Sequence, residues 1–257
     1  MINKPDAVVS KGIIFAGCSF TWGHGLDTQD ERDITTWPYF LGKKINASKT
    51  VNLSHGNGSN NRIFRTTLNW LSKQSQEDLD NTIAIIQFSE AARNEFYYPM
   101  DEHDPTENFK DRWIRYKPGL MNGDDTLKID FMNSPYYAPS QQGYSLWSTQ
   151  LASTLLASSV FSMIGLFQTY GIKKYWFWPH NHDGDKLSAE FIEVFKKTPW
   201  IYDSYMDPFK YEQRRDNPAR WKTTDDQHPS PVGHEQIAQQ IYDYIKVTFD
   251  GDQILFD

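Results

Sequence analysis

The stretch Ile83 to Phe88 (IAIIQF) decides the fold class, because it is almost continuously apolar and rich in β-branched side chains. Strands that are covered by helices on both faces have this composition, since neither face meets water. The sequence therefore predicts that residues 83–88 form a buried strand of a parallel sheet.

Other predicted strands and helices alternate on either side of this strand. Strands are expected at residues 12–17, 50–53 and 174–178, and helices at about residues 36–45, 144–170, 188–197 and 232–247. A further helix, capped by Ser59 or Asn60, is expected to carry its apolar face on Ile63, Phe64, Leu68 and Leu71. Strands that alternate with helices are joined by right-handed crossovers and form a parallel sheet with helices on both faces. The predicted fold class is α/β: a flavodoxin-like three-layer α/β/α sandwich with a mostly parallel central sheet.

One domain is expected over residues 1–257, because this length suits a single α/β domain and no repeat or second pattern interrupts it. The stretch at about residues 95–142 breaks the alternation. It is polar, contains several prolines and carries aromatic residues without a steady period. We interpret it as an irregular insertion that acts as a lid or substrate flap over one end of the sheet.

Composition excludes several classes of function. The net charge is −7 and the basic residues are scattered, so the sequence does not predict binding to nucleic acid. Cys18 is the only cysteine, and residues 1–11 are too polar for the apolar core of a secretory signal. No apolar run reaches the roughly 20 residues of a membrane helix. We expect a cytoplasmic protein without membrane contact, or a virion-associated one if the chain is phage-encoded.

A serine and a histidine lie where the chemistry of such a sheet is expected, since ligands bind at the carboxyl ends of its strands. Ser19 follows the first strand, in the loop GCSFTWG at residues 17–23. A serine becomes a nucleophile only when a base accepts its proton. His228 is the candidate base, and Asp225, three residues earlier, can orient its imidazole.

Three other features suggest sites less strongly. The stretch 180–185 (HNHDGD) holds four possible metal ligands, but its spacing matches no structural zinc pattern. His24 lies near Ser19 in sequence but lacks an obvious carboxylate partner apart from Asp27. His234 is expected to be a surface or capping residue at the start of the last helix. The sequence predicts neither a metal ion nor a cofactor.

Several motifs together resemble the SGNH/GDSL hydrolase superfamily. They are Gly-x-Ser-x-Thr at residues 17–21, Asn-Gly-Ser-Asn at residues 57–60 and Asp-x-x-His-Pro-Ser-x-x-Gly-His at residues 225–234. Trp37-Pro38-Tyr39 is similar to a segment of members from phage and environmental bacterial genomes. The resemblance implies a triad of Ser19, His228 and Asp225, with the backbone N–H groups of Ser19 and Gly58 forming an oxyanion hole.

The sequence departs from the superfamily at two positions. Cys18 stands where members usually have Asp, and residues 87–90 (QFSE) stand where members have Gly-x-Asn-Asp. The asparagine that completes the oxyanion hole is therefore missing. Its substitute is either Ser89 or a side chain from the neighbouring loop, Asn57, Asn60 or Asn61.

Two functions from different classes fit this sequence. The first is a serine esterase acting on a small acyl ester, with an O-acetylated carbohydrate as the favoured substrate. Aromatic rings suited to stacking on sugars lie in the insertion: Tyr97, Tyr98, Trp113, Tyr116, Tyr136 and Tyr137. The second is a catalytically weak or inactive binding or structural protein with the same fold, such as a glycan-binding virion component.

Overall fold

A four-stranded parallel sheet forms the centre of the molecule in a computed structural model that describes residues 12–56, 58–89, 93–97, 113–117, 120–122, 149–179 and 228–249. Its strand order is β2-β1-β3-β7. The strands are β1 (Gly12–Ala16), β2 (Lys49–Asn52), β3 (Thr82–Phe88) and β7 (Lys174–Pro179). Each neighbouring pair is parallel, and Ala16 at the end of β1 pairs with Ile86 of β3.

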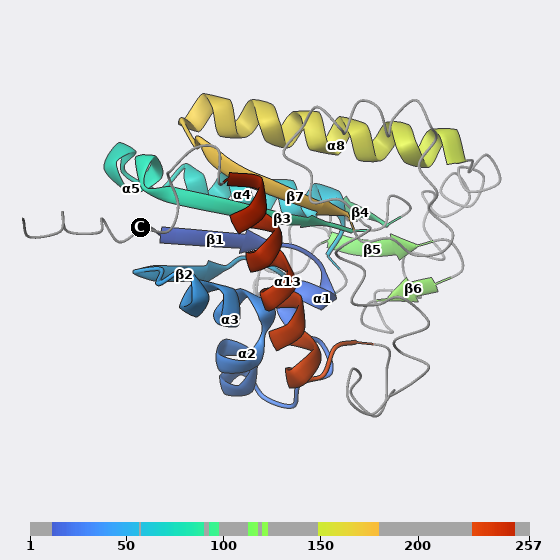
Figure 1. Ribbon diagram of the computed structural model, residues 1–257. Helices are drawn as coiled ribbons and strands as arrows, with labels where there is room; N and C mark the ends of the chain where they lie inside the picture. The colour runs from blue at the N-terminus through green and yellow to red at the C-terminus, as the bar shows by residue number, and fades with distance from the viewer. Residues whose placement is uncertain are drawn as a thin grey trace, which may run out of the picture.

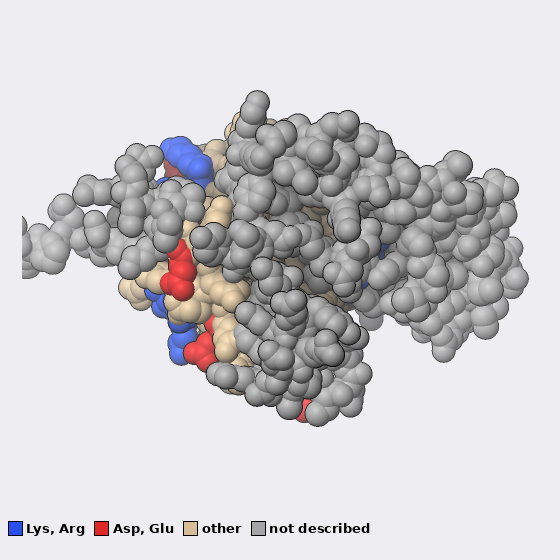
Figure 2. Space-filling view, turned by 45° about the vertical axis from the view of Figure 1, so that its right-hand side comes forward, with Lys and Arg blue, Asp and Glu red and all other residues tan. Residues whose placement is uncertain are grey.

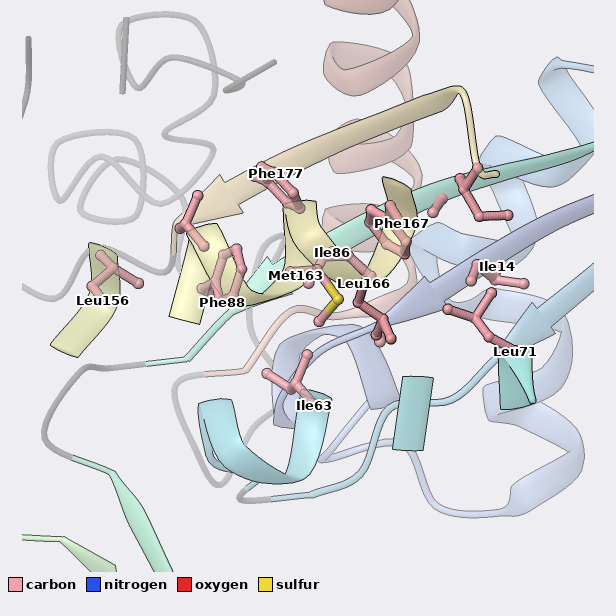
Figure 3. Packing of buried hydrophobic residues seen from close by; sticks show 14 of the residues in the cluster. Ile14, Ile63, Leu71, Ile86, Phe88, Leu156, Met163, Leu166, Phe167 and Phe177 are labelled. Atoms are coloured by element: carbon pink, nitrogen blue, oxygen red, sulfur yellow. The ribbon is translucent and has the colours of Figure 1, made fainter. Parts of the chain in front are cut away.

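Helices cover both faces of the sheet (Figure 1). One face packs against α4 (Asn60–Leu71), α5 (Gln76–Asp80) and α8 (Thr149–Tyr170). The other face packs against α3 (Trp37–Lys44) and α13 (Pro231–Phe249). Because side chains alternate along a strand, β3 sends Ile86 and Phe88 into the first layer and Ile83 and Ile85 into the second. Figure 3 shows the first layer, where Phe88 and Phe177 lie beside Met163 and Phe167 of α8.

The predicted three-layer α/β sandwich with a parallel sheet is therefore confirmed. Ends of elements differ from the predicted ones by one or two residues at β1, β2, β3, β7, α3 and α13. The predicted start of the long helix at residue 144 and the predicted helix at residues 188–197 lie outside the described residues.

Two short helices were missed because they have almost no apolar face. No helix was predicted at residues 29–35, yet α2 (Gln29–Thr35) forms there without a buried residue. The side chain of Thr28 caps this helix by accepting a hydrogen bond from the Glu31 N–H. Ser75 caps α5 in the same way through Asp78. Capping and local hydrogen bonds, rather than apolar spacing, define these helices.

The stretch predicted to be irregular contains a second, antiparallel sheet. Its strands β4 (Asn94–Tyr97), β5 (Trp113–Lys117) and β6 (Leu120–Asn122) pair in sequence order. Figure 1 shows them beyond the carboxyl ends of β3 and β7. The prediction of an irregular insertion is wrong for these residues, whereas its role as a lid stays a prediction.

Two surface observations concern the expected partners. Among the described residues, none of the helices combines the length and apolar character that crossing a membrane requires. On the face shown in Figure 2, the described Lys and Arg side chains are separated by Asp, Glu and uncharged side chains.

Candidate active site

Ser19 lies at the carboxyl end of β1, at the first position of the one-turn helix α1 (Ser19–Trp22). The turn closes at Gly23, whose φ of 86° is in the left-handed region that favours glycine. Asn52 at the end of β2 donates a hydrogen bond of 3.0 Å to the Thr21 carbonyl, which ties the turn to the neighbouring strand. Ser19 is only 2% exposed.

The Ser19 hydroxyl is paired with an imidazole from the other end of the chain. His228 Nε2 lies 2.8 Å from Ser19 Oγ. His228 precedes α13, and the first turn of this helix is capped by Ser230, whose hydroxyl accepts a hydrogen bond from the Gly233 N–H at 3.2 Å. The cap fixes where α13 begins, and the imidazole is held just ahead of it. The structure thus brings together the two residues that the sequence selected as nucleophile and base.

Two further rings pack on the imidazole of His228. The ring centroid of Phe20 lies 4.7 Å from that of His228, and the ring centroid of His24 lies 4.6 Å away. His24 is exposed, whereas Phe20 is buried. Neither contact was predicted from the sequence, although both residues follow Ser19 within five positions.

Gly58 packs directly against the turn that carries Ser19. A Cβ atom at Gly58 would lie 3.2 Å from the Gly17 carbonyl oxygen and 3.8 Å from Cys18 Cα, so the two loops touch through their backbones. The Gly58 N–H donates to the His55 carbonyl at 3.0 Å. This amide was expected to serve the oxyanion hole, and in this structure it is engaged within its own loop.

Asn60 and Ser89 form a reciprocal pair of hydrogen bonds between the loops that follow β2 and β3. Asn60 Oδ1 accepts from the Ser89 N–H at 2.7 Å, and Asn60 Nδ2 donates to the Ser89 carbonyl at 3.2 Å. Both residues are buried. The Ser89 hydroxyl has no hydrogen-bond partner among the described residues. The carboxamide of Asn60 therefore holds Ser89 in place and leaves the Ser89 hydroxyl available.

A buried carboxamide lies beneath the serine turn. Gln87 is 0% exposed, and its Oε1 accepts a hydrogen bond from the Thr21 hydroxyl. Cys18 Sγ lies 3.7 Å from the same oxygen. In the sequence, Gln87 stood out only as part of a departure from the superfamily pattern. A polar residue inside a continuously buried strand was the available signal.

His234 is a correction to the sequence-based expectation, because it is 0% exposed rather than on the surface. Burial and the nearby His228 lower the pKa of His234 to about 3 from an ordinary value of 6.5. Neither ring nitrogen has a hydrogen-bond partner among the described residues. His234 shares the buried face of α13 with Ile237, Ala238 and Ile241, and this helical spacing was the signal that indicated its burial.

The remaining predicted residues cannot be placed in the same way. Asp225 and Asn57 lie outside the described residues, as does the stretch 180–185 that was considered for metal binding. Within the described part of the chain, no three His, Cys, Asp or Glu side chains gather as metal ligands. A cavity of about 280 Å³ lies at the opposite, amino ends of the strands, and it is lined by Gly12, Lys49 and Trp70 among others.

One sequence family matches this chain. It is DUF6071, described as a family of unknown function, and it matches residues 24–185, which are more than half of the chain. The match includes Gly58, Asn60 and Ser89 but neither Ser19 nor His228. No curated protein matches the chain in sequence.

Two solved structures have the same fold. The psychrotrophic esterase EstA from Pseudoalteromonas sp., solved as inhibited by monoethylphosphonate, is 12% identical with a TM-score of 0.51, covering 94% of this chain and 100% of its own. A lipolytic protein of the G-D-S-L family from Veillonella parvula is 10% identical with a TM-score of 0.50, covering 90% of this chain and 96% of its own. The predicted resemblance to SGNH/GDSL proteins is thus confirmed for the fold.

Proposed function

The chain belongs to DUF6071, a family of unknown function, and we propose that it is a serine ester hydrolase with Ser19 as nucleophile and His228 as base. The observation that carries the proposal is the 2.8 Å separation of Ser19 Oγ and His228 Nε2 at the carboxyl ends of the strands of a parallel sheet. A nucleophile and its base need this hydrogen-bond reach. The shared fold with an esterase supports the same class of reaction.

The reaction follows from this geometry. His228 Nε2 takes the proton from Ser19 Oγ while that oxygen forms a bond with the acyl carbon of the ester. The tetrahedral intermediate collapses when the bond to the leaving alkoxide breaks, and the imidazolium returns the proton to that oxygen. A water molecule then attacks the acyl-enzyme with His228 again as base, which releases the carboxylic acid and restores Ser19.

Asp225 is proposed as the third member of the triad. A carboxylate three residues before His228 can accept a hydrogen bond from imidazole Nδ1, which fixes the tautomer that leaves Nε2 facing Ser19. The same bond would stabilise the imidazolium that forms during each proton transfer.

The oxyanion hole is assigned to the Ser19 N–H and the Ser89 hydroxyl. The Ser19 N–H stands at the start of α1, where the first amides of a helix have no partner within it. The Ser89 hydroxyl is buried and without a partner among the described residues, and Asn60 fixes its backbone. Asn60 is therefore a positioning residue here. The Gly58 N–H contributes only if it turns from the His55 carbonyl, and Asn57 is a further candidate from the same loop.

The proposed substrate is a small acyl ester, with an O-acetylated carbohydrate as the favoured class. Its support is the sequence of the insertion, where aromatic residues are frequent and sugar rings stack on such side chains. Release of acetate from acetylated glycans, measured alongside hydrolysis of a simple aryl acetate, tests this class. Equal specific activity on both would remove the preference for a carbohydrate.

A second function is supported by one observation, the engagement of the Gly58 N–H with the His55 carbonyl. Without that donor and without the superfamily asparagine, the hole offers fewer hydrogen bonds. Loss of one donor costs about a hundredfold or more in rate. The second candidate is therefore a catalytically weak or inactive binding protein that keeps the pocket and binds an acylated glycan.

The experiment that separates the two functions is labelling of the purified protein with a fluorophosphonate, which needs no knowledge of the substrate. Ser19 Oγ would displace fluoride and become phosphonylated. We expect mass spectrometry to place the label on Ser19, and the variants Ser19→Ala and His228→Ala to remain unlabelled. A folded protein that takes no label would favour the binding protein.

A further inference from the structure

We propose that Gln87 is a positioning residue for the nucleophile, because its side-chain carbonyl holds the turn that carries Ser19 on both sides. This inference rests on the proposed function and assigns a role to a residue outside the triad and the oxyanion hole. It concerns a buried carboxamide that the reaction itself never touches.

The contacts of Gln87 reach both flanks of Ser19. The Thr21 hydroxyl, two residues after Ser19, donates to Gln87 Oε1. The Cys18 thiol, one residue before Ser19, has its sulfur 3.7 Å from the same oxygen. One acceptor atom on the rigid central strand β3 therefore fixes two points of the turn, and Ser19 lies between them.

Close packing holds the backbone of the turn against β3, whereas the contacts to Gln87 Oε1 set the directions of the Thr21 and Cys18 side chains. A Cβ atom at Gly17 would lie 2.8 Å from Thr21 Cβ and 3.0 Å from Gln87 Cβ, so the turn is pressed onto β3. Gly58 closes the other side against Gly17 and Cys18. Loss of the acceptor oxygen would therefore change the direction of the Thr21 and Cys18 side chains, and with them the orientation of Ser19 toward His228.

The second atom of the carboxamide argues against a purely structural role. Gln87 Nε2 is buried and has no hydrogen-bond partner among the described residues. A buried donor without a partner costs stability, whereas an apolar side chain of similar shape avoids this cost. A methionine at position 87 would therefore suit the core at least as well, and the advantage of glutamine lies in its acceptor oxygen.

The test measures fluorophosphonate labelling of Ser19 in four single variants and in the double variant of Gln87→Met with Thr21→Val, as the limiting rate of labelling and the probe concentration for half-saturation. Gln87→Met removes the acceptor, and Gln87→Glu keeps an acceptor oxygen. Thr21→Val removes the donor without changing the size of the side chain. Gln74→Met is the matched control, because Gln74 is also a hydrogen-bonded glutamine but lies far from Ser19. Its Nε2 donates to the Trp70 carbonyl, and it lines the cavity at the amino ends of the strands.

We expect the limiting rate to fall about tenfold to a hundredfold in Gln87→Met, as a small misplacement of a reacting group would cause. The half-saturating concentration should stay constant, and Gln87→Glu should recover most of the rate. The limiting rate should fall by a similar factor in Thr21→Val. The double variant should label no more slowly than the slower single variant, because the two substitutions remove the same hydrogen bond. The control should label like the wild-type protein.

Two results would overturn the inference. One is a wild-type rate in Gln87→Met or in Thr21→Val while the wild-type protein labels at Ser19. The other is a fully additive double variant. Failure of the wild-type protein itself to label would instead overturn the proposed hydrolase. Thr21→Val keeps the test decisive if Gln87→Met does not fold.

Discussion

His228 Nε2 lies 2.8 Å from Ser19 Oγ, although 209 positions of the sequence separate the two residues. The fold makes this contact possible. Ser19 follows the carboxyl end of β1, and His228 lies just before α13, so the start of α13 is placed beside the carboxyl end of β1. The proposed ester hydrolysis depends on this hydrogen bond between Ser19 and the imidazole of His228.

Removal of either partner of this pair should abolish ester hydrolysis. We expect Ser19→Ala and His228→Ala each to lower kcat for an aryl acetate by at least about 10³-fold, and the double variant to be no worse than one single variant. Steady-state kinetics on folded variants measures this. His24→Phe is the control, since it keeps a ring against His228. It should not reach the roughly hundredfold loss that removal of a general base causes. A loss as large as that of His228→Ala would make His24 the base.

Much of the fold was predictable because burial leaves a periodic trace in the sequence. Residues 83–88 are apolar apart from Gln87 and form the central strand β3, and the long helix ending at Tyr170 buries Val160, Met163 and Phe167 at helical spacing. Helices α2 and α5 bury almost nothing, so periodicity could not reveal them. The pairing of β4, β5 and β6 depends on contacts between strands rather than on spacing within one strand.

The candidate site was predictable only where a residue's place in the sheet and its motif indicate the same role. Ser19 and His228 meet both conditions, since each lies at the carboxyl ends of the strands and each belongs to a recognisable motif. The role of Asn60 depends on its two bonds to the Ser89 backbone, which no linear pattern encodes. His234 was misplaced because a histidine near a helix start suggests a cap, although its spacing from Ile237 and Ile241 indicated burial.

The Ser89 hydroxyl can be tested as an oxyanion donor. Ser89→Ala removes it and should lower kcat by about tenfold to a hundredfold with little change in KM, because the interaction would exist only in the transition state. Ser54→Ala is the matched control, since the Ser54 hydroxyl is also buried without a partner among the described residues. Its kcat should equal that of the wild-type protein. Equal activity of all three proteins would exclude Ser89 from the oxyanion hole.

The buried imidazole of His234 should make stability depend on pH. Its pKa is about 3 in the folded protein and 6.5 ordinarily, so the unfolded state binds the proton more readily. The contribution of His234 to stability is therefore complete above about pH 6.5 and is lost as the pH falls toward 3. Each pH unit in this range costs up to about 1.4 kcal/mol. Between pH 6.5 and pH 5 the loss should reach about 1.5 kcal/mol.

Urea unfolding followed by tryptophan fluorescence at pH 7, 6 and 5 measures this dependence. His234→Leu should show a shallower loss of stability on acidification than the wild-type protein, whatever its stability at pH 7. Gln240→Leu, a change on the same helix without a titrating group, should keep the wild-type dependence. Parallel curves for His234→Leu and the wild-type protein would mean that His234 is not held neutral.

Two glycine substitutions should have opposite effects on stability. A Cβ atom at Gly17 would meet Thr21 Cβ at 2.8 Å and Gln87 Cβ at 3.0 Å, beneath Ser19. Gly17→Ala should therefore lower the free energy of unfolding by about 1–3 kcal/mol, as overpacking does, and should also slow labelling of Ser19. Gly165 lies exposed inside α8, where a Cβ atom would have no neighbour within 4 Å. Gly165→Ala should raise the free energy of unfolding by about 1 kcal/mol, because alanine favours the helix, and should leave labelling unchanged. Urea unfolding and labelling of the same samples measure the stability and the reactivity of the two variants. A Gly17→Ala protein as stable and as reactive as the wild-type protein would contradict the close packing of the serine turn on β3.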